Sequence, residues 1–125
     1  MSLFSNLFAK QEDVYSDFNW IPLLELAQLN EIVKTASKKT VVIFKHSTRC
    51  GVSRGVISQF EKQSDYDNID FYFLDLLNFR DISNAIAHNF GVPHQSPQLL
   101  VLKNKKVVAH ASHYSIIDIN LEKFI

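Results

Sequence analysis

The sequence predicts an α/β domain built on a central, mixed, four-stranded sheet with helices on both faces. Short apolar runs rich in β-branched residues alternate along the chain with segments whose apolar residues recur at helical spacing. This alternation indicates parallel strands joined by right-handed crossovers. Two of the apolar runs instead follow one another across a short turn, and this pair predicts an antiparallel hairpin. The 125 residues suit one domain.

The first half of the chain predicts a helix, a buried strand and a second helix. Apolar residues recur at helical spacing over residues 23–36, and Pro22 stands near the start of that helix. Residues 40–44 form a nearly unbroken apolar run, which is typical of a strand covered by helices on both faces. After a polar turn, helical spacing returns and predicts a helix from about Cys50 to near Ser64.

The second half predicts the remaining three strands and two further helices. Gly91 is expected to end the second of the crossover helices, because glycine adopts the left-handed conformation that commonly follows a helix. A turn at residues 104–105 joins the two strands of the hairpin. In chain order the expected elements are a strand at 69–76, a helix at 81–90, strands at 98–102 and 106–110, and a helix at 116–124.

The composition is that of an ordinary globular protein, with 46% hydrophobic and 21% charged residues. Thirteen basic residues balance thirteen acidic ones, so neither nucleic acid nor a membrane is expected as a partner. No stretch approaches the roughly 20 apolar residues that span a bilayer, and residues 1–10 do not resemble a secretory signal. One cysteine cannot form an internal disulfide, which fits a reducing compartment. We expect a cytoplasmic protein with an N-terminal arm (residues 1–19) and one domain (residues 20–125).

The single cysteine lies in the polar turn between the predicted buried strand and the helix that follows. Cys50 is flanked by Arg49 and Gly51, whereas a cysteine used only for packing would lie within an apolar run. Thiolates are the nucleophilic form, and the first turn of a helix favours negative charge. Arg49 adds a cation, and Ser53, on the same helical face, can donate a hydrogen bond to the sulfur. The pattern predicts a reactive thiol at the carboxyl end of a strand.

The histidines near this turn are less informative. His46 can tune Cys50 or act as an acid, although a structural or surface role is more common. A cysteine–histidine protease would need an orienting third group and an oxyanion hole, and the sequence offers no candidate for either. His110 and His113 with Cys50 are too few for a structural zinc site, so no metal is predicted.

Pro97 directly precedes the third predicted strand, a position at which proline is tolerated. A cis peptide bond is a reasonable expectation there, because cis bonds are almost confined to proline. An ordinary trans proline remains the alternative, and Pro93 competes for the same role.

Four sequence blocks stand out, at residues 44–53 (FKHSTRCGVS), residues 80–87 followed by 90–92, residues 96–98 and residues 111–113. In this order they resemble the monothiol bacilliredoxin family of thioredoxin-like proteins, a bacterial group linked to bacillithiol and to general stress. The resemblance covers most of the chain from about Trp20 to Ile119. The element order agrees with the thioredoxin-like fold that this resemblance implies.

The resemblance implies thiol–disulfide exchange at Cys50. Cys50 would take a low-molecular-weight thiol from an S-thiolated client protein, and a second small thiol, acting as co-substrate, would regenerate it. Ser53 occupies the position of a resolving cysteine, and a cis Pro97 would leave the backbone of Ser96 free to pair with the substrate. No further cofactor is implied. The expected catalytic residues are Cys50, Ser53, Arg49 and Pro97, and the expected substrate-binding residues are Thr48, Gly51, Ser96 and His46.

Two alternative functions remain open. The segment CGVS at residues 50–53 differs at one position from the CGFS signature of monothiol glutaredoxins, which hold a bridging iron–sulfur cluster. However, the glycine pair that their glutathione-binding members carry is missing. The chain could also be a thioredoxin-like module that binds a partner without turnover, with Phe4, Leu7 and Phe8 as docking contacts.

Overall fold

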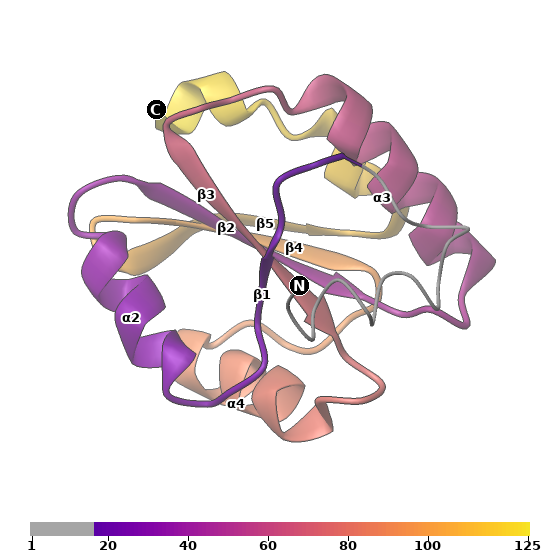
Figure 1. Cartoon of the computed structure of the whole chain (residues 1–125), viewed down its shortest axis with the longest axis horizontal. Helices are drawn as coiled ribbons and strands as arrows, with labels where there is room; N and C mark the ends of the chain where they lie inside the picture. Colours follow the sequence, from indigo (N-terminus) through magenta and orange to yellow (C-terminus); the bar gives the residue numbers. More distant parts are fainter. Residues whose placement is uncertain (1–16) are drawn as a thin grey trace.

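In the computed structural model, which describes residues 17–125, the chain forms one five-stranded mixed sheet in the order β1-β3-β2-β4-β5 (Figure 1). β1, β3 and β2 are parallel, whereas β2 pairs antiparallel with β4, and β4 with β5. The strands are β1 (Ile21–Pro22), β2 (Thr40–His46), β3 (Ile69–Asp75), β4 (Gln98–Lys103) and β5 (Lys106–Ser112). The helices are α2 (Gln28–Thr35), α3 (Gly51–Gln63), α4 (Arg80–Phe90) and the 3₁₀ helices η2 (His113–Asp118) and η3 (Leu121–Phe124).

The expected mixed sheet with helices on both faces is confirmed, with one additional strand. α3, η2 and η3 cover one face, and α2 and α4 cover the other (Figure 1). The additional strand, β1, has only two residues, which is too short to give a recognisable sequence pattern. The predicted arm contacts Phe4, Leu7 and Phe8 lie outside the described residues. Within the described part of the chain, no helix is both long and apolar enough to cross a bilayer.

Two hydrophobic cores flank the sheet, and the central strand contributes to both. Residues 40–44 of β2 are buried, as their nearly unbroken apolar run predicts. The strand also extends over Lys45 and His46, which are buried as well, although the sequence predicts a polar turn there. Val42 and Phe44 face the core beneath α3, which contains Phe60 and Trp20. Ile43 faces the opposite core, which is lined mainly by aliphatic side chains from α2 and α4.

The first helix begins later than predicted. Residues 23–27 form a turn, and Pro22 lies in β1 rather than at a helix start. The Gln28 side chain explains this, because its carbonyl oxygen accepts hydrogen bonds from the backbone N–H groups of Leu24 and Glu25 at 2.6 and 2.9 Å. Its amide nitrogen also donates to the Pro22 carbonyl at 2.9 Å. The Gln28 side chain thus satisfies two backbone N–H groups and one carbonyl before the helix begins.

The single helix predicted over residues 116–124 is wrong, since two 3₁₀ helices occupy this region. η2 begins at His113, and the backbone becomes extended at Ile119 before η3 starts. The Asn120 side chain accepts a hydrogen bond from the Glu122 N–H at 3.1 Å, which begins a new turn. Ile116 and Leu121 are buried against the α3-side core, so burial accounts for the apolar pattern.

The other predicted elements agree with the structure. α3 begins and ends as expected, with Cys50 and Ser64 flanking it. Gly91 ends α4 in the left-handed conformation, with φ of 66°. Asn104 and Lys105 both have positive φ, at 55° and 67°, which gives the hairpin turn a backbone twist that matches the flanking strands.

Candidate active site

Cys50 lies at the carboxyl edge of the sheet, where the end of β2 meets the start of α3. It is the N-cap residue of α3, with an extended backbone (φ −104°, ψ 119°). Its N–H donates to the Ser47 carbonyl at 3.2 Å, and its own carbonyl accepts from the Arg54 N–H at 3.1 Å. The thiol is free and half-buried. It therefore lies at the end of a helix whose unpaired amides and dipole attract negative charge.

A buried serine and a buried histidine lie beneath this turn. Ser53 and His46 are both fully inaccessible to solvent. The Ser53 hydroxyl oxygen accepts a hydrogen bond from the Ser47 N–H at 3.1 Å and lies 2.8 Å from His46 Nδ1. These contacts tie the first turn of α3 to the last residues of β2. No hydrogen bond joins Ser53 to Cys50 in the described structure, so the expected donation to the sulfur remains a prediction.

Burial keeps His46 uncharged. Desolvation, followed by the nearby Arg54 cation, lowers the pKa of His46 from 6.5 to about 4. His46 is therefore neutral near pH 7 and acts as a hydrogen-bonding group rather than as a charge. Its Nε2 is buried and has no hydrogen-bond partner among the described residues.

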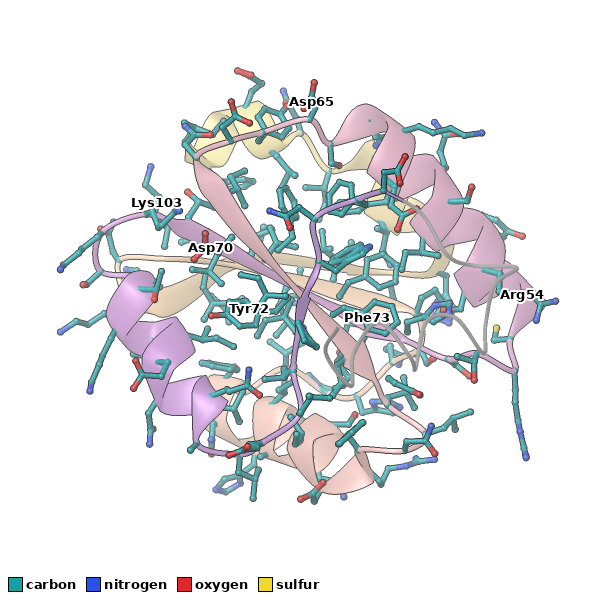
Figure 2. All side chains as sticks on the ribbon, viewed as in Figure 1. Arg54, Asp65, Asp70, Tyr72, Phe73 and Lys103 are labelled. Atoms are coloured by element: carbon teal, nitrogen blue, oxygen red, sulfur yellow. The ribbon has the colours of Figure 1, made fainter. Side chains whose placement is uncertain are left out.

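Arg54 is a second cation at this turn, and the sequence analysis did not identify it. Figure 2 shows Arg54 near the start of α3, and its Nη1 donates to the Thr48 carbonyl at 3.2 Å. Arg49, the cation predicted from sequence, is exposed. Neither arginine forms a salt bridge with a carboxylate in the described part of the chain. The two arginines thus place positive charge at the Cys50 turn, which favours anionic ligands. The helical spacing of residues 50 and 54 could have identified Arg54.

The start of β4 lies beside the end of β2 at the same edge of the sheet. The peptide bond between Ser96 and Pro97 is cis, as expected. The Pro97 carbonyl accepts a hydrogen bond from the N–H of His113 at 3.0 Å, and His113 has a left-handed backbone with φ of 56°. The Ser96 hydroxyl is buried and has no partner among the described residues.

A buried lysine lies on the other face of β2 at this edge. Lys45 is fully inaccessible to solvent, and its Nζ lies 2.7 Å from His94 Nδ1. Desolvation, followed by Arg80, lowers the pKa of Lys45 from 10.5 to about 8. The burial of Lys45 and its contact with His94 were not predicted from the sequence. A lysine directly after a run predicted to be buried on both faces was an available signal, because lysine is rarely buried.

The structure brings the residues predicted from sequence to one edge of the sheet. Cys50 and its neighbours Thr48, Arg49 and Gly51 form the turn and the first residue of α3. His46 and Ser53 lie beneath this turn, and Ser96 and Pro97 precede the adjacent strand β4. The catalytic and binding roles of these residues remain predictions.

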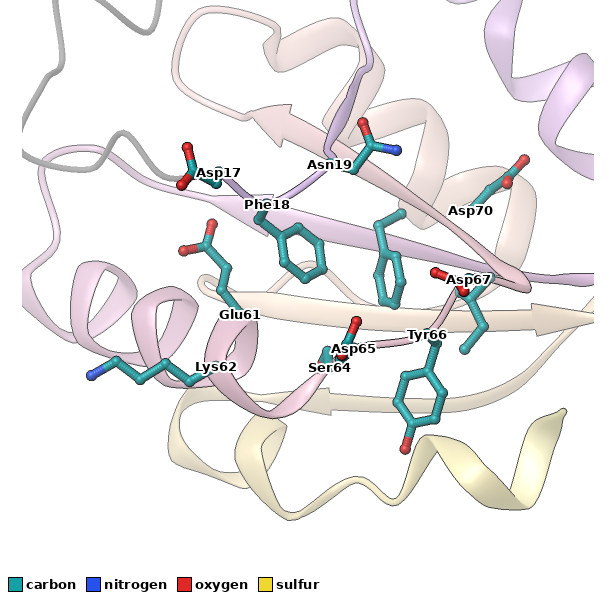
Figure 3. Close-up of a pocket in the computed structure, with 12 residues that line it drawn as sticks. Asp17, Phe18, Asn19, Glu61, Lys62, Ser64, Asp65, Tyr66, Asp67 and Asp70 are labelled. Carbon is teal, nitrogen blue, oxygen red and sulfur yellow. The ribbon is translucent and has the colours of Figure 1, made fainter.

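A separate hollow lies away from this site. Its volume is about 530 Å³, and it lies beside the end of α3 and the start of β3, at the opposite edge of the sheet from Cys50 (Figure 3). Carboxylates dominate its lining, including Asp17, Asp65 and Asp67. No group of three or more histidine, cysteine or carboxylate side chains within residues 17–125 has the arrangement of a metal site.

Comparisons with known proteins agree with the fold described above. A family model described as "Monothiol bacilliredoxin BrxC" matches residues 21–121. A solved thioredoxin-fold structure, described as a candidate oxidoreductase, is 30% identical with a TM-score of 0.69, over 78% of this chain and 87% of the other. Reduced thioredoxin pre-protein from Schistosoma mansoni is 24% identical with a TM-score of 0.67, over 86% and 99%. Thioredoxin NaTrxh from Nicotiana alata is 22% identical with a TM-score of 0.67, over 87% and 91%. The latter two show similarity of fold.

Proposed function

The chain belongs to the monothiol bacilliredoxin family, a group of thioredoxin-like thiol oxidoreductases, and from this premise we propose that it removes a low-molecular-weight thiol from mixed disulfides on client proteins. Cys50 is the proposed nucleophile, and the proposed small thiol is of the bacillithiol type. We further propose that the protein works in the cytoplasm, where small thiols keep proteins reduced.

The position of Cys50 carries this proposal. The thiol is half-buried at the N-terminus of α3, between Arg49 and the Arg54 side chain, and it is the only cysteine in the chain. Ser53 stands where a dithiol enzyme would carry its resolving cysteine. Its side chain is fully buried, and its hydroxyl contacts His46 Nδ1 and the Ser47 N–H. An adduct on Cys50 therefore has no internal thiol to displace it, so regeneration requires a second, external thiol.

The proposed reaction is two successive exchanges. The Cys50 thiolate attacks the small-thiol sulfur of the client's mixed disulfide, a new S–S bond forms, and the client sulfur leaves as a thiolate that takes a proton from water. A second small thiolate then attacks the adduct, releasing the Cys50 thiolate and a disulfide of two small thiols. Each step breaks one S–S bond and forms another, so electrons balance without a further cofactor.

The site residues contribute positioning and charge to these steps. Arg49 and Arg54 add positive charge beside the sulfur, and the first turn of α3 adds the helix dipole. His46 and Ser53 hold the turn from beneath. The backbones of Thr48 and Ser96 are the proposed contacts for the bound adduct, while Gly51 keeps the approach open, since a Cβ there would meet no atom within 4 Å.

Transfer of a small thiol can be followed by intact-protein mass spectrometry. The reduced chain is mixed with a one-cysteine client protein capped by bacillithiol, cysteine or glutathione. We expect the cap to leave the client and to appear on the chain in a one-to-one ratio. Cys50→Ser should leave the client fully capped. The cap that transfers fastest identifies the preferred thiol.

Alkylation of Cys50 with iodoacetamide provides the companion measurement. Normal alkylation with no transfer from any cap would overturn the proposed function and favour a thioredoxin-like binding module. An iron–sulfur protein would instead show a visible absorption band and a cluster-bridged dimer after reconstitution with iron and sulfide.

A further inference from the structure

Lys45 is the least expected residue in the interior of this domain. Its side chain is fully buried, yet no carboxylate lies within salt-bridge distance in the described part of the chain. A buried ammonium without a counter-charge destabilises a fold, and an aliphatic side chain of similar length would avoid that cost. Lys45 is nevertheless buried without a counter-charge among the described residues, at the edge of the sheet where Cys50 lies. This exception suggests that Lys45 has a role in the site.

The geometry defines the hydrogen bond that Lys45 makes. An ammonium can only donate, so His94 Nδ1, 2.7 Å away, must accept. His94 is therefore neutral and carries its proton on Nε2. Partial burial and the cations Lys45 and Arg80 lower the pKa of His94, which agrees with this assignment. The Ser83 hydroxyl of α4 also approaches His94 Nδ1, at 3.3 Å.

This bond joins β2, the strand that precedes the Cys50 turn, to the loop that precedes β4. Lys45 lies one residue before the end of β2, after which the chain turns to Cys50. His94 belongs to the loop of residues 91–97 between α4 and β4. A second tie holds the same loop, because Gln98, directly opposite Lys45 in the sheet, donates from Nε2 to the Pro93 carbonyl at 2.9 Å. The 91–97 loop is thus held by two hydrogen bonds, one between Lys45 and His94 and one between Gln98 and Pro93.

We propose that the Lys45–His94 hydrogen bond is a positioning device that holds the 91–97 loop against the Cys50 turn, so that the backbone at Ser96 is in place to bind the incoming disulfide. The proposal rests on the proposed function. Lys45 and His94 act through the loop rather than on the reacting sulfurs. Their loss therefore weakens substrate binding and leaves the chemistry of the bound complex and of Cys50 itself largely unchanged.

A matched pair of variants at His94 isolates this hydrogen bond. Asparagine places an oxygen where His94 has Nδ1, so His94→Asn keeps the acceptor, whereas His94→Leu has similar size without it. The substrate is a short peptide whose one cysteine is capped by cysteine, and single-turnover rates are measured against its concentration. We expect His94→Leu to raise the half-saturating concentration about ten-fold, the size expected for one hydrogen bond to a charged group, with an unchanged limiting rate. His94→Asn should restore it.

Lys45→Met supplies the second arm. In that background the Lys45 donor is gone and, of the described donors, only the more distant Ser83 hydroxyl remains, so the difference in half-saturating concentration between His94→Asn and His94→Leu should shrink markedly. His88→Leu, which changes an exposed histidine of α4, is the control and should behave as the parent chain. Equal values for His94→Asn and His94→Leu in the parent background, or a fall in the limiting rate alone, would overturn the inference.

The test separates this inference from the proposed function. If the parent chain alkylates at Cys50 but accepts no cap, whether bacillithiol, cysteine or glutathione, the proposed function fails, and the inference fails with it. If the parent chain accepts the cap and the His94 variants match it, only the inference fails. A parallel loss of alkylation by iodoacetamide in His94→Leu would show damage to Cys50 itself and would also overturn the inference.

Discussion

At the scale of single residues, the Cys50 turn depends on two buried polar side chains, Ser53 and His46, and on one exposed hydrogen bond from Arg54. Ser53 receives the Ser47 N–H and contacts His46 Nδ1, while Arg54 donates to the Thr48 carbonyl. Each contact ties α3 to the turn that precedes it. A buried polar group without a partner costs about 1–3 kcal/mol. The buried side chains of Ser53 and His46 therefore constrain the turn more strongly than an exposed loop would be constrained.

The buried His46 makes folding stability sensitive to acid. Its pKa is lowered to about 4 in the folded chain, whereas an exposed histidine titrates near 6.5. Between these values the unfolded chain binds a proton that the folded chain does not, so stability falls as pH drops from 6.5 to 4. Above pH 6.5 this contribution is fully present. The expected loss by pH 4 is on the order of 3 kcal/mol, from 1.36 kcal/mol per unit of pKa shift.

Urea unfolding at several pH values checks this expectation, with the slope of stability against pH as the measured quantity. His46→Asn should remove that part of the slope, even if its stability at pH 7 is lower. His88→Asn, at an exposed position, should retain the parent slope. His94 contributes in the same direction, since its pKa is also lowered, so some acid sensitivity should survive in His46→Asn. Identical slopes for His46→Asn and the parent chain would contradict the assignment.

The sequence placed these residues at the site but did not predict their contacts. His46, Cys50 and Ser53 are close along the chain, so their grouping follows from the predicted strand and helix. The partner of Ser53 depends on the path of residues 47–50, which no periodic pattern describes. The hydrogen bond predicted from the Ser53 hydroxyl to the sulfur stays a prediction, and the described contacts of this hydroxyl are with Ser47 and His46.

At the scale of elements, two positions depend on left-handed backbone geometry. Gly91 ends α4 with φ of 66°, and Lys105 completes the β4–β5 turn with φ of 67°. Glycine adopts this conformation freely, whereas other residues pay roughly 1–2 kcal/mol for it. Gly91 therefore suits the left-handed conformation of its position, whereas Lys105 does not.

Opposite substitutions at these positions should therefore have opposite effects. Gly91→Ala should destabilise the fold by about 1 kcal/mol, and Lys105→Gly should stabilise it by up to about 1 kcal/mol. A Cβ at Gly91 would meet no atom within 4 Å, so conformation rather than a clash is responsible. Thermal and urea unfolding measure both changes. Gly55→Ala, in the interior of α3 with open space around it, is a control that should stabilise by about 1 kcal/mol through helix propensity alone.

Elements with a strong period were predicted well, and elements set by local side-chain hydrogen bonds were not. β2, α3 and α4 lie within a few residues of their expected bounds because long apolar patterns define them. Gln28 delays α2, and Asn120 starts η3 as a new turn. Each effect arises from one side chain that hydrogen-bonds to the backbone. The apolar pattern is the same with or without such a bond, so it does not reveal either effect.

At the scale of the whole molecule, the sheet separates an aromatic core from an aliphatic one. Trp20 and Phe60 stack on the α3 side with ring centroids 6.1 Å apart and an interplanar angle of 22°. Phe44 packs against both rings. Trp20 is the only tryptophan in the chain, and its Nε1 donates to Glu61 at 2.6 Å. Its fluorescence therefore reports on the integrity of this core.

Truncation of Phe60 should show how much the aromatic core contributes to the free energy of unfolding. Phe60 is almost fully buried, so Phe60→Ala should lower the free energy of unfolding by about 3–5 kcal/mol. Urea unfolding followed by Trp20 emission measures this loss. Ser58→Ala, at an exposed position of the same helix, should change stability by no more than about 0.5 kcal/mol. A loss below about 1 kcal/mol for Phe60→Ala would contradict the described packing.

The pairing of β2 has a consequence for synthesis on the ribosome. Its neighbours in the sheet, β3 and β4, both follow it in the chain, and β4 is made only after α4 is complete. Until then, one side of β2 has no partner strand in the emerging chain, although all seven of its residues are buried in the folded domain. Such an open edge is prone to pair with other chains. The nascent protein should therefore depend on a chaperone, or on rapid elongation through residues 76–103, more than its small size suggests.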